Sequence, residues 1–245
     1  MKCCSWGSWF VVGLAVVVGL ALGGCGGSSE ESSEPTERSS SSSGSEERAE
    51  PSDGIMVSGL MGTIRSDQVE NALNPRMPRF TRCFADRMGT IELLAGDIRM
   101  SFRISTDGQV LWVYPSESTV GDRDTERCIL DVARGTRFPR PNGGEAEFSW
   151  GFGLDADGPR PATSWSSTDL GTRESEVRAV GRECRARGSH RITAYIMPAG
   201  SVLAAGGTMP DPEGEGALDC ILDRVRSMTM PDPGSWPAKV TFDVP

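Results

Sequence analysis

The residues of this 245-residue chain that could carry out acid–base or nucleophilic chemistry do not match a catalytic motif in their types and spacing. The single histidine, His190, stands among arginines directly before a predicted strand, a setting more typical of a surface turn than of a general base. The sequence has neither a Gly-x-Ser-x-Gly motif for a nucleophile nor a Gly-x-x-x-x-Gly-Lys motif for a phosphate. We therefore expect no catalytic residue, and the pattern favours a protein that is not an enzyme.

Candidate metal ligands are equally sparse. Asp155-Ala156-Asp157-Gly158 matches the beginning of a calcium-binding loop, but Ser166 occupies the position of the bidentate glutamate that such a loop requires. No cysteines have the Cys-x-x-Cys spacing of a zinc site. The sequence predicts no metal and no cofactor, and residues 159–171 are expected to be a linker.

The beginning of the chain has the features of an export signal. Lys2 precedes an apolar run, residues 9–22, which is too short to cross a bilayer core, since a spanning helix needs roughly 20 residues. Leu22-Gly23-Gly24-Cys25 resembles the lipobox of bacterial lipoproteins. The resemblance implies a signal peptide over residues 1–25 that is cleaved before Cys25, and a lipid on Cys25. Ordinary cleavage with Cys25 incidental, and an uncleaved anchor, are the alternatives.

These features predict a lipid-anchored protein of the cell envelope, on the periplasmic face of the outer membrane. Gly26, which follows Cys25, is not the aspartate associated with inner-membrane retention in enteric bacteria. Residues 26–54 hold many serines, eight acidic side chains and two arginines, and they bury too little apolar surface to fold. We expect a disordered tether there. It carries −6 of the net charge of −9, and the rest has no basic excess that would predict nucleic-acid binding.

The remainder of the chain contains the same pattern twice. Twenty positions separate Gly108 from Cys128, and twenty also separate Gly200 from Cys220. Ten residues beyond each cysteine stands an apolar residue followed by Pro-x-Pro, beginning at Phe138 and at Met230. A duplicated folding unit is the simplest explanation, over residues 55–158 and 172–245.

Each unit is predicted to fold as helix, β-hairpin, helix and final strand. In the first unit, apolar residues recur at helical spacing over residues 77–88. Strict alternation over residues 98–104 predicts a strand with one buried face, and Thr106-Asp107-Gly108 predicts the hairpin turn. Asp122 is a candidate cap for the second helix and Gly135 marks its end. The sequence therefore predicts an α+β fold with a small antiparallel sheet in each of two tandem units.

Four of the seven cysteines remain when the signal and Cys25 are set aside. An even number in an exported chain predicts two disulfides, and spacing alone allows three pairings. The repeat selects one pairing, because each unit has one cysteine before its hairpin and one after it. We expect the disulfides Cys83–Cys128 and Cys184–Cys220, each closing a loop of about 40 residues and contributing on the order of 3 to 4 kcal/mol.

The second unit has smaller residues at aligned core positions. Phe102 aligns with Ala194, and Trp112 aligns with Ala204. Replacing a buried aromatic side chain by alanine costs roughly 3 to 5 kcal/mol in an otherwise unchanged core. We therefore expect the second unit to depend on packing against the first.

An ordered set of motifs spans the first unit: a helix with Cys83, then Asp107-Gly108, Cys128-Ile129, Phe138-Pro139-Arg140-Pro141, Asn142-Gly143-Gly144 and an aromatic final strand. This set resembles the TonB-like C-terminal domain of myxobacterial gliding-motility and envelope proteins, the AgmX/PglI type. The resemblance covers residues 60–154, and the second unit follows through the internal alignment. It implies helices laid on a small antiparallel sheet whose edge pairs with an extended segment of a partner.

The expected partner is an envelope protein or a peptide segment of one, which the tandem units bind or scaffold. An alternative partner is a cell-wall polymer or another anionic ligand, met by arginines on the first helix of each unit. A solvated helix face balanced by Glu174, Glu176 and Glu183 is the interpretation that we favour. The arginines concerned are Arg76, Arg79, Arg82, Arg87, Arg173, Arg178, Arg182, Arg185 and Arg187.

Overall fold

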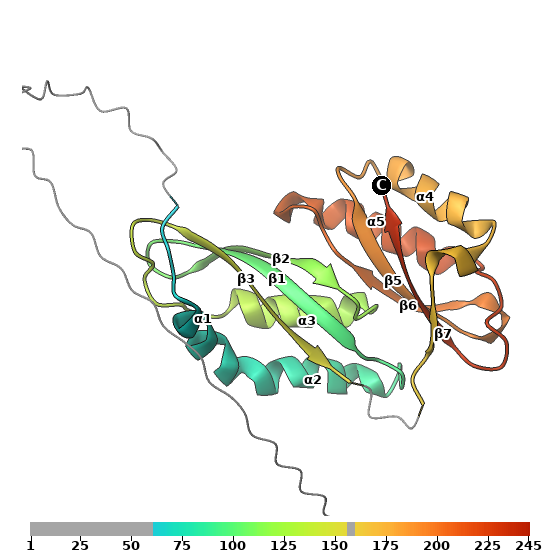
Figure 1. The fold of residues 1–245 in the computed structure, drawn as a ribbon, viewed down its shortest axis with the longest axis horizontal. Helices are drawn as coiled ribbons and strands as arrows, with labels where there is room; N and C mark the ends of the chain where they lie inside the picture. The colour runs from blue at the N-terminus through green and yellow to red at the C-terminus, as the bar shows by residue number, and fades with distance from the viewer. Residues whose placement is uncertain (1–60, 156–159) are drawn as a thin grey trace, which may run out of the picture. The chain divides into compact units, whose positions relative to one another are not determined.

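Two lobes of similar construction follow each other along the chain (Figure 1). The computed structural model describes residues 61–155, which we name lobe 1, and residues 160–245, which we name lobe 2. The expected signal, the lipidation site at Cys25 and the tether lie outside the described residues. Lobe 1 contains α1 (Ser66–Leu73), η1 (Asn74–Arg76), α2 (Met77–Met88), β1 (Gly96–Ile104), β2 (Val110–Ser118), α3 (Arg123–Arg134) and β3 (Ala146–Leu154). Lobe 2 contains β4 (Thr163–Trp165), η2 (Ser167–Leu170), α4 (Arg173–Glu183), β5 (His190–Ile196), η3 (Pro198–Gly200), β6 (Val202–Gly207), η4 (Pro212–Gly214), α5 (Glu215–Ser227) and β7 (Ala238–Val244).

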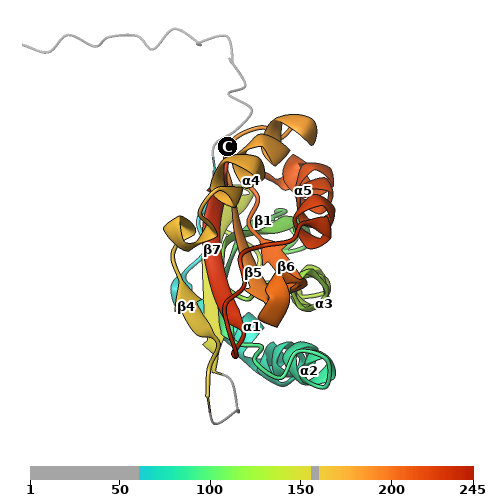
Figure 2. The ribbon, with the colours of Figure 1, turned by 90° about the vertical axis from the view of Figure 1, so that its right-hand side faces the viewer.

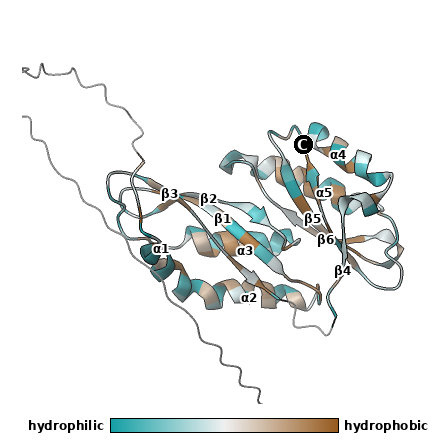
Figure 3. Ribbon diagram, in the orientation of Figure 1, coloured by the Kyte–Doolittle hydropathy of each residue, from teal (hydrophilic) through white to brown (hydrophobic). Residues whose placement is uncertain are grey.

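In lobe 1, α2 and α3 pack on a three-stranded antiparallel sheet of order β2-β1-β3. The alternating apolar residues of β1 are buried in this core, as predicted, and the ring of Phe102 stacks on that of Phe148 with centroids 4.9 Å apart. Both helices carry hydrophobic as well as hydrophilic residues (Figure 3), as expected of helices with one buried face. The carboxylate of Asp122 caps α3 by accepting from the amide of Thr125, so the predicted helix start is confirmed.

Lobe 2 repeats this sheet and adds a strand to it. The order is β4-β7-β5-β6, in which β6-β5-β7 corresponds to β2-β1-β3. Ile192, Ala194 and Ile196 of β5 share a buried core with α5, which lies along this sheet (Figure 2). The short strand β4 pairs with β7 in parallel, so the second sheet is mixed rather than purely antiparallel as expected. The α+β class is confirmed.

The correspondence between the lobes extends to single hydrogen bonds. Gly108 and Gly200 both have positive φ, at 75° and 82°, and each makes the hairpin turn of its lobe. The amide of Phe138 donates to the Gly108 carbonyl at 2.9 Å, and the amide of Met230 donates to the Gly200 carbonyl at 2.8 Å. The apolar residue before each Pro-x-Pro motif is therefore tied to the turn in the same way in both lobes.

Disulfides join the two helices of each lobe. Cys83 of α2 is bonded to Cys128 of α3, and Cys184 at the end of α4 is bonded to Cys220 of α5. The Cα atoms are 5.7 Å apart in both pairs, within the usual range for a disulfide. These are the two pairs that the repeat predicted.

The outer face of the lobe 2 sheet, opposite α5, is covered by lobe 1. Thr193 and Tyr195 of β5 are fully buried there, and Ala204 of β6 is 2 % exposed. Tyr195 and Ala204 belong to the same buried cluster as the core of lobe 1. The small side chain of Ala204 is thus explained by docking. Its counterpart Trp112, which we expected in a core, lies half-buried on the opposite face of its sheet from Phe102.

None of the helices in the described part of the chain has the length and hydropathy of a bilayer-crossing segment.

Candidate functional site: an edge strand and the junction between the lobes

β3 is an edge strand, because within the described residues it pairs only with β1. The backbone amide and carbonyl of one strand residue point toward the strand on one side, and those of the next residue point toward the other side. The amide of Thr119 donates to the carbonyl of Asp97, and the amide of Ser105 donates to the carbonyl of Gln109, both at 2.8 Å. Odd-numbered residues of β1 therefore bond toward β2, and even-numbered residues bond toward β3.

The outward backbone groups of β3 belong to its odd-numbered residues. The even-numbered residues of β1 lie opposite even-numbered residues of β3, so those amides and carbonyls are used within the sheet. The carbonyl of Glu145 fits this pattern, because it accepts from the amide of Gly62 on the outer side. Beyond that contact, β3 offers a row of amides and carbonyls that have no strand partner in the described part: Glu147, Ser149, Gly151 and Gly153.

The two faces of β3 differ in the side chains that they present along this edge. Phe148, Trp150 and Phe152 are half-buried on the helix-facing side, where the Phe80 ring lies 5.6 Å from that of Trp150 and 5.1 Å from that of Phe152. The opposite side carries mainly small exposed residues, including Ser149 and Gly151. β3 contains neither lysine nor proline, residues that commonly protect sheet edges from pairing. An added strand would place alternate side chains beside the aromatic row.

The equivalent edge of lobe 2 is occupied. β4 pairs with the first half of β7, with Ser164 opposite Lys239, and Trp165 packs against the lobe 2 core. The amide of Thr163 donates to the carbonyl of Pro237 at 2.9 Å, the counterpart of the bond from Gly62 to Glu145 in lobe 1. The segment that we expected to be a linker thus contributes a strand to this sheet.

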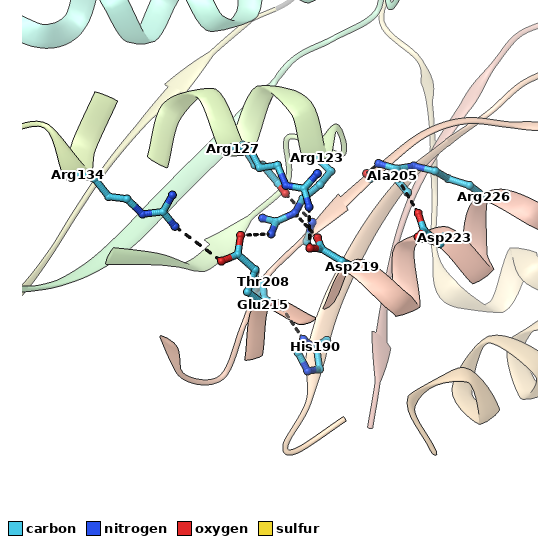
Figure 4. Close-up of polar contacts among 12 residues, drawn as sticks. Arg123, Arg127, Arg134, His190, Ala205, Thr208, Glu215, Asp219, Asp223 and Arg226 are labelled. Carbon is cyan, nitrogen blue, oxygen red and sulfur yellow. Dashed lines mark hydrogen bonds and ion pairs between the residues drawn. The ribbon is translucent and has the colours of Figure 1, made fainter. Parts of the chain in front are cut away.

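A buried arginine joins the two lobes (Figure 4). Arg123 at the start of α3 is 1 % exposed, and its guanidinium donates to Glu215 and to Asp219 of α5, both at 2.9 Å. Arg127 adds a contact of 2.6 Å to Asp219. Glu215, the first residue of α5, therefore belongs to this junction.

Glu126, one turn after Arg123, is completely buried at the same junction. Its Oε1 accepts from the Ser118 hydroxyl at 2.7 Å, and its Oε2 accepts from the Gly207 amide of β6 at 3.0 Å. A Cβ on Gly206 would lie 2.6 Å from Oε1, so the β6 backbone reaches the carboxyl only because this residue is glycine. Burial raises the pKa of Glu126 to about 7, and the two hydrogen bonds offset only part of that rise.

A second polar contact between the lobes surrounds the backbone of Ala95. The Tyr195 hydroxyl accepts from the Ala95 amide and donates to the Ala95 carbonyl, both at 3.1 Å. The Nζ of Lys239 donates to the same carbonyl at 2.7 Å and lies 5.3 Å from the centroid of the Tyr195 ring. Burial lowers the pKa of Lys239 to about 8 and raises that of Tyr195 to about 12. These contacts fix the segment before β1 against β5 and β7.

The prediction that His190 lies on a surface turn is wrong. His190 is the first residue of β5 and is fully buried. Its Nδ1 lies 3.0 Å from the Thr208 carbonyl, so Nδ1 carries the proton, while Nε2 is buried without a partner among the described residues. Burial lowers the pKa of His190. The strand starts one residue earlier than expected, which turns this side chain into the protein interior.

The arginines of the first helices are partly paired. Arg87 donates to the buried Asp122 carboxylate at 2.9 Å and 3.0 Å. On α4, Arg173 pairs with Glu176 at 2.6 Å and Arg178 with Glu174 at 2.8 Å, as the balanced-face interpretation expects. On α2, Arg82 lies 3.7 Å from Asp86.

No cluster of three or more potential metal ligands occurs in residues 61–155 and 160–245. The calcium-like sequence that begins at Asp155 extends into residues outside that part.

Sequence reasoning missed the residues that hold the lobes together. Arg123 and Glu126 lie on a helix turn that is charged in sequence, and nothing local marks them as buried. The one available signal was Gly206-Gly207, which directly follows the predicted strand over residues 202–205 and ends β6, since a glycine in a strand often marks a close approach of another group. Comparison with known protein families, with curated proteins and with solved structures finds no match to this chain.

Proposed function

We propose that the protein is a noncatalytic lipoprotein of the cell envelope, whose two TonB-like units bind or scaffold other envelope proteins. The binding mode that we favour is strand addition, in which an extended segment of the partner pairs with β3. A lipid on Cys25 would hold the protein at the membrane. A flexible tether over residues 26–54 would allow a reach of about 30 Å.

The observation that carries the proposal is the contrast between β3 and β7. β7 has β4 along its edge, and β3 has no strand there within the described residues. Because the strands correspond, β4 serves as an internal example of what the lobe 1 edge would accept. It is extended, it runs parallel to the edge strand, and it places Trp165 against the apolar core.

Proline substitution at Ser149 tests this mode. The Ser149 amide points away from β1, so Ser149→Pro removes an edge donor while leaving the ladder to β1 in place. Ser149→Ala is the matched control, because it removes the hydroxyl and keeps the amide. We expect immobilised wild-type protein and Ser149→Ala to retain the same proteins from a solubilised envelope fraction, and Ser149→Pro to lose them. Thermal unfolding of each variant checks that the fold is intact.

A salt series on the same material separates the two classes of partner. Retention by strand addition relies on backbone hydrogen bonds and apolar contacts, so it should persist at high ionic strength. Equal retention by a folded Ser149→Pro variant, or complete loss of retention with salt, would contradict strand addition. Loss with salt would favour the anionic ligand of the alternative.

A further inference from the structure

The junction between the lobes is built around a carboxyl group that no cation contacts directly. Glu126 is completely buried, and its two hydrogen bonds come from neutral donors, one in each lobe. The nearby cation Arg123 pairs with other carboxylates, those of Glu215 and Asp219.

Ionisation of Glu126 destabilises the docked arrangement, because an ionised carboxylate loses its hydration when it is buried. The protonated form keeps two hydrogen bonds, since the Ser118 hydroxyl can accept from it while the Gly207 amide still donates. Opening of the junction would move β6 away from the Glu126 carboxyl, and the carboxyl would then be hydrated. The docked and open arrangements therefore differ in how tightly Glu126 holds a proton.

We propose that Glu126 is a proton-responsive latch between the lobes, which favours docking of lobe 2 on lobe 1 when it is protonated and weakens that docking when it is ionised.

The direction in which docking changes with pH follows from the difference in the pKa of Glu126 between the docked and open arrangements. Burial raises the pKa of Glu126 from 4.5 to about 7 in the docked arrangement. A raised pKa of an acid stabilises the docked arrangement fully below the ordinary pKa, and this contribution is lost as the pH rises toward 7. Between pH 5.5 and 7.5 the docking equilibrium should weaken on the order of tenfold.

Other charged groups at the junction modify this response in known directions. Asp122, buried beside Glu126 and bonded to Arg87, raises the pKa of Glu126, and Arg123 lowers it. β6 contributes no titratable side chain, since its sequence is Val-Leu-Ala-Ala-Gly-Gly. Lys239, at the Ala95 contact, has a pKa lowered to about 8, so it favours docking only as the pH rises above that value. Measurement at pH 5.5 and 7.5 keeps its contribution small.

Hydrogen exchange of the full chain tests the latch. The protection of the β6 amides, Gly207 in particular, reports opening once the intrinsic pH dependence of exchange is removed. We expect protection in the wild-type protein to fall on the order of tenfold from pH 5.5 to 7.5. Glu126→Gln, which cannot ionise, should retain high protection at both values. Glu117→Gln is the matched control, because Glu117 is an exposed acid of the same lobe, and it should behave as wild type.

A second measurement requires only the wild-type protein. Carbon-13 NMR of the assigned Glu126 carboxyl should show a titration midpoint near 7. A midpoint near the ordinary value of 4.5 would overturn the proposal. Protection of β6 that does not change with pH in the wild-type protein, or that changes equally in Glu126→Gln, would also overturn it.

Discussion

The two lobes share the order helix, hairpin, helix and final strand, and they use the outer faces of their sheets differently. In lobe 2 this face carries Ala204 and Gly206 and is covered by lobe 1. The corresponding residues of lobe 1 are Trp112 and Tyr114, which lie half-buried with ring centroids 5.4 Å apart. The small residues on this face of lobe 2 are therefore explained by docking, whereas Ala194, the counterpart of Phe102, lies in the core of lobe 2 itself.

The lobes also differ at the edges of their sheets and on the second helix of each lobe. β4 covers the edge of β7, while β3 keeps an edge that nothing in the described part pairs with. Leu218 of α5 occupies the position that Glu126 occupies on α3, so the buried carboxyl exists in one lobe only. Lobe 2 thus uses its outer face for docking, and lobe 1 has an edge strand without a strand partner among the described residues. Four experiments test this division, in order of expected effect.

Separation of the lobes should have the largest effect. A fragment of residues 160–245 keeps β4 but loses the cover over Thr193, Tyr195 and Ala204, so we expect it to melt at least about 10 °C lower than residues 55–158, and less cooperatively. Addition of the 55–158 fragment should restore part of the lost stability. Equal melting of the two fragments, measured by calorimetry, would contradict the dependence of lobe 2 on lobe 1.

A methyl group at Gly206 should weaken docking. In Gly206→Ala the new Cβ would lie 2.6 Å from the Glu126 carboxyl and 2.8 Å from the backbone nitrogen of Asp122. We expect a loss of about 1 to 3 kcal/mol in the free energy of unfolding, measured in urea. Gly216→Ala on α5 is the control, since nothing lies within 4 Å of its Cβ. A similar loss in both variants would remove the close approach as the cause.

Removal of one hydroxyl should have a smaller effect at the Ala95 contact. Tyr195→Phe leaves the Ala95 amide without its partner, so we expect a loss of about 1 to 2 kcal/mol by urea unfolding. Tyr114 of β2, whose ring packs against the lobe 2 core, supplies the comparison. Tyr114→Phe should change the free energy of unfolding by less than about 0.5 kcal/mol. A reversed order would show that the Tyr195 hydroxyl does not stabilise docking.

The buried histidine should produce the smallest effect, confined to acid. The lowered pKa of His190 means that its contribution is complete above pH 6.5 and is lost as the pH falls, because the unfolded chain then binds a proton that the folded one does not. Glu126 acts in the opposite direction, so the comparison is made in Glu126→Gln. There, unfolding free energy should fall between pH 6.5 and 5 by up to about 1.4 kcal/mol per pH unit. Adding His190→Asn should remove that slope, and an unchanged slope would exclude His190 as its source.

Local patterns in the sequence were sufficient for most of the architecture. The strand alternation, the cap at Asp122 and the spacing of the cysteines each depend on neighbours within one unit, and the structure agrees with them. The duplication supplied the disulfide pairing, because the same spacing had to be satisfied twice.

The contacts between the lobes were beyond such patterns. The burial of Arg123 and Glu126 depends on Asp219 and Gly207 of the other lobe, far away in the sequence, and charged side chains are exposed by default. β4 was missed because a strand of three residues is too short to show alternation. The open edge of β3 could be recognised only when the partner strand of each lobe was known.

Exchange at two equivalent amides tests the central contrast most directly. Glu147 and Lys239 occupy the same position in β3 and β7, opposite Arg103 and Tyr195 respectively. In a parallel pair a residue bonds to both neighbours of its opposite residue, so the Lys239 amide bonds within β4 while the Glu147 amide faces outward. We expect the Lys239 amide to exchange far more slowly than the Glu147 amide when hydrogen exchange is measured by NMR. Equal protection of the two amides would contradict it.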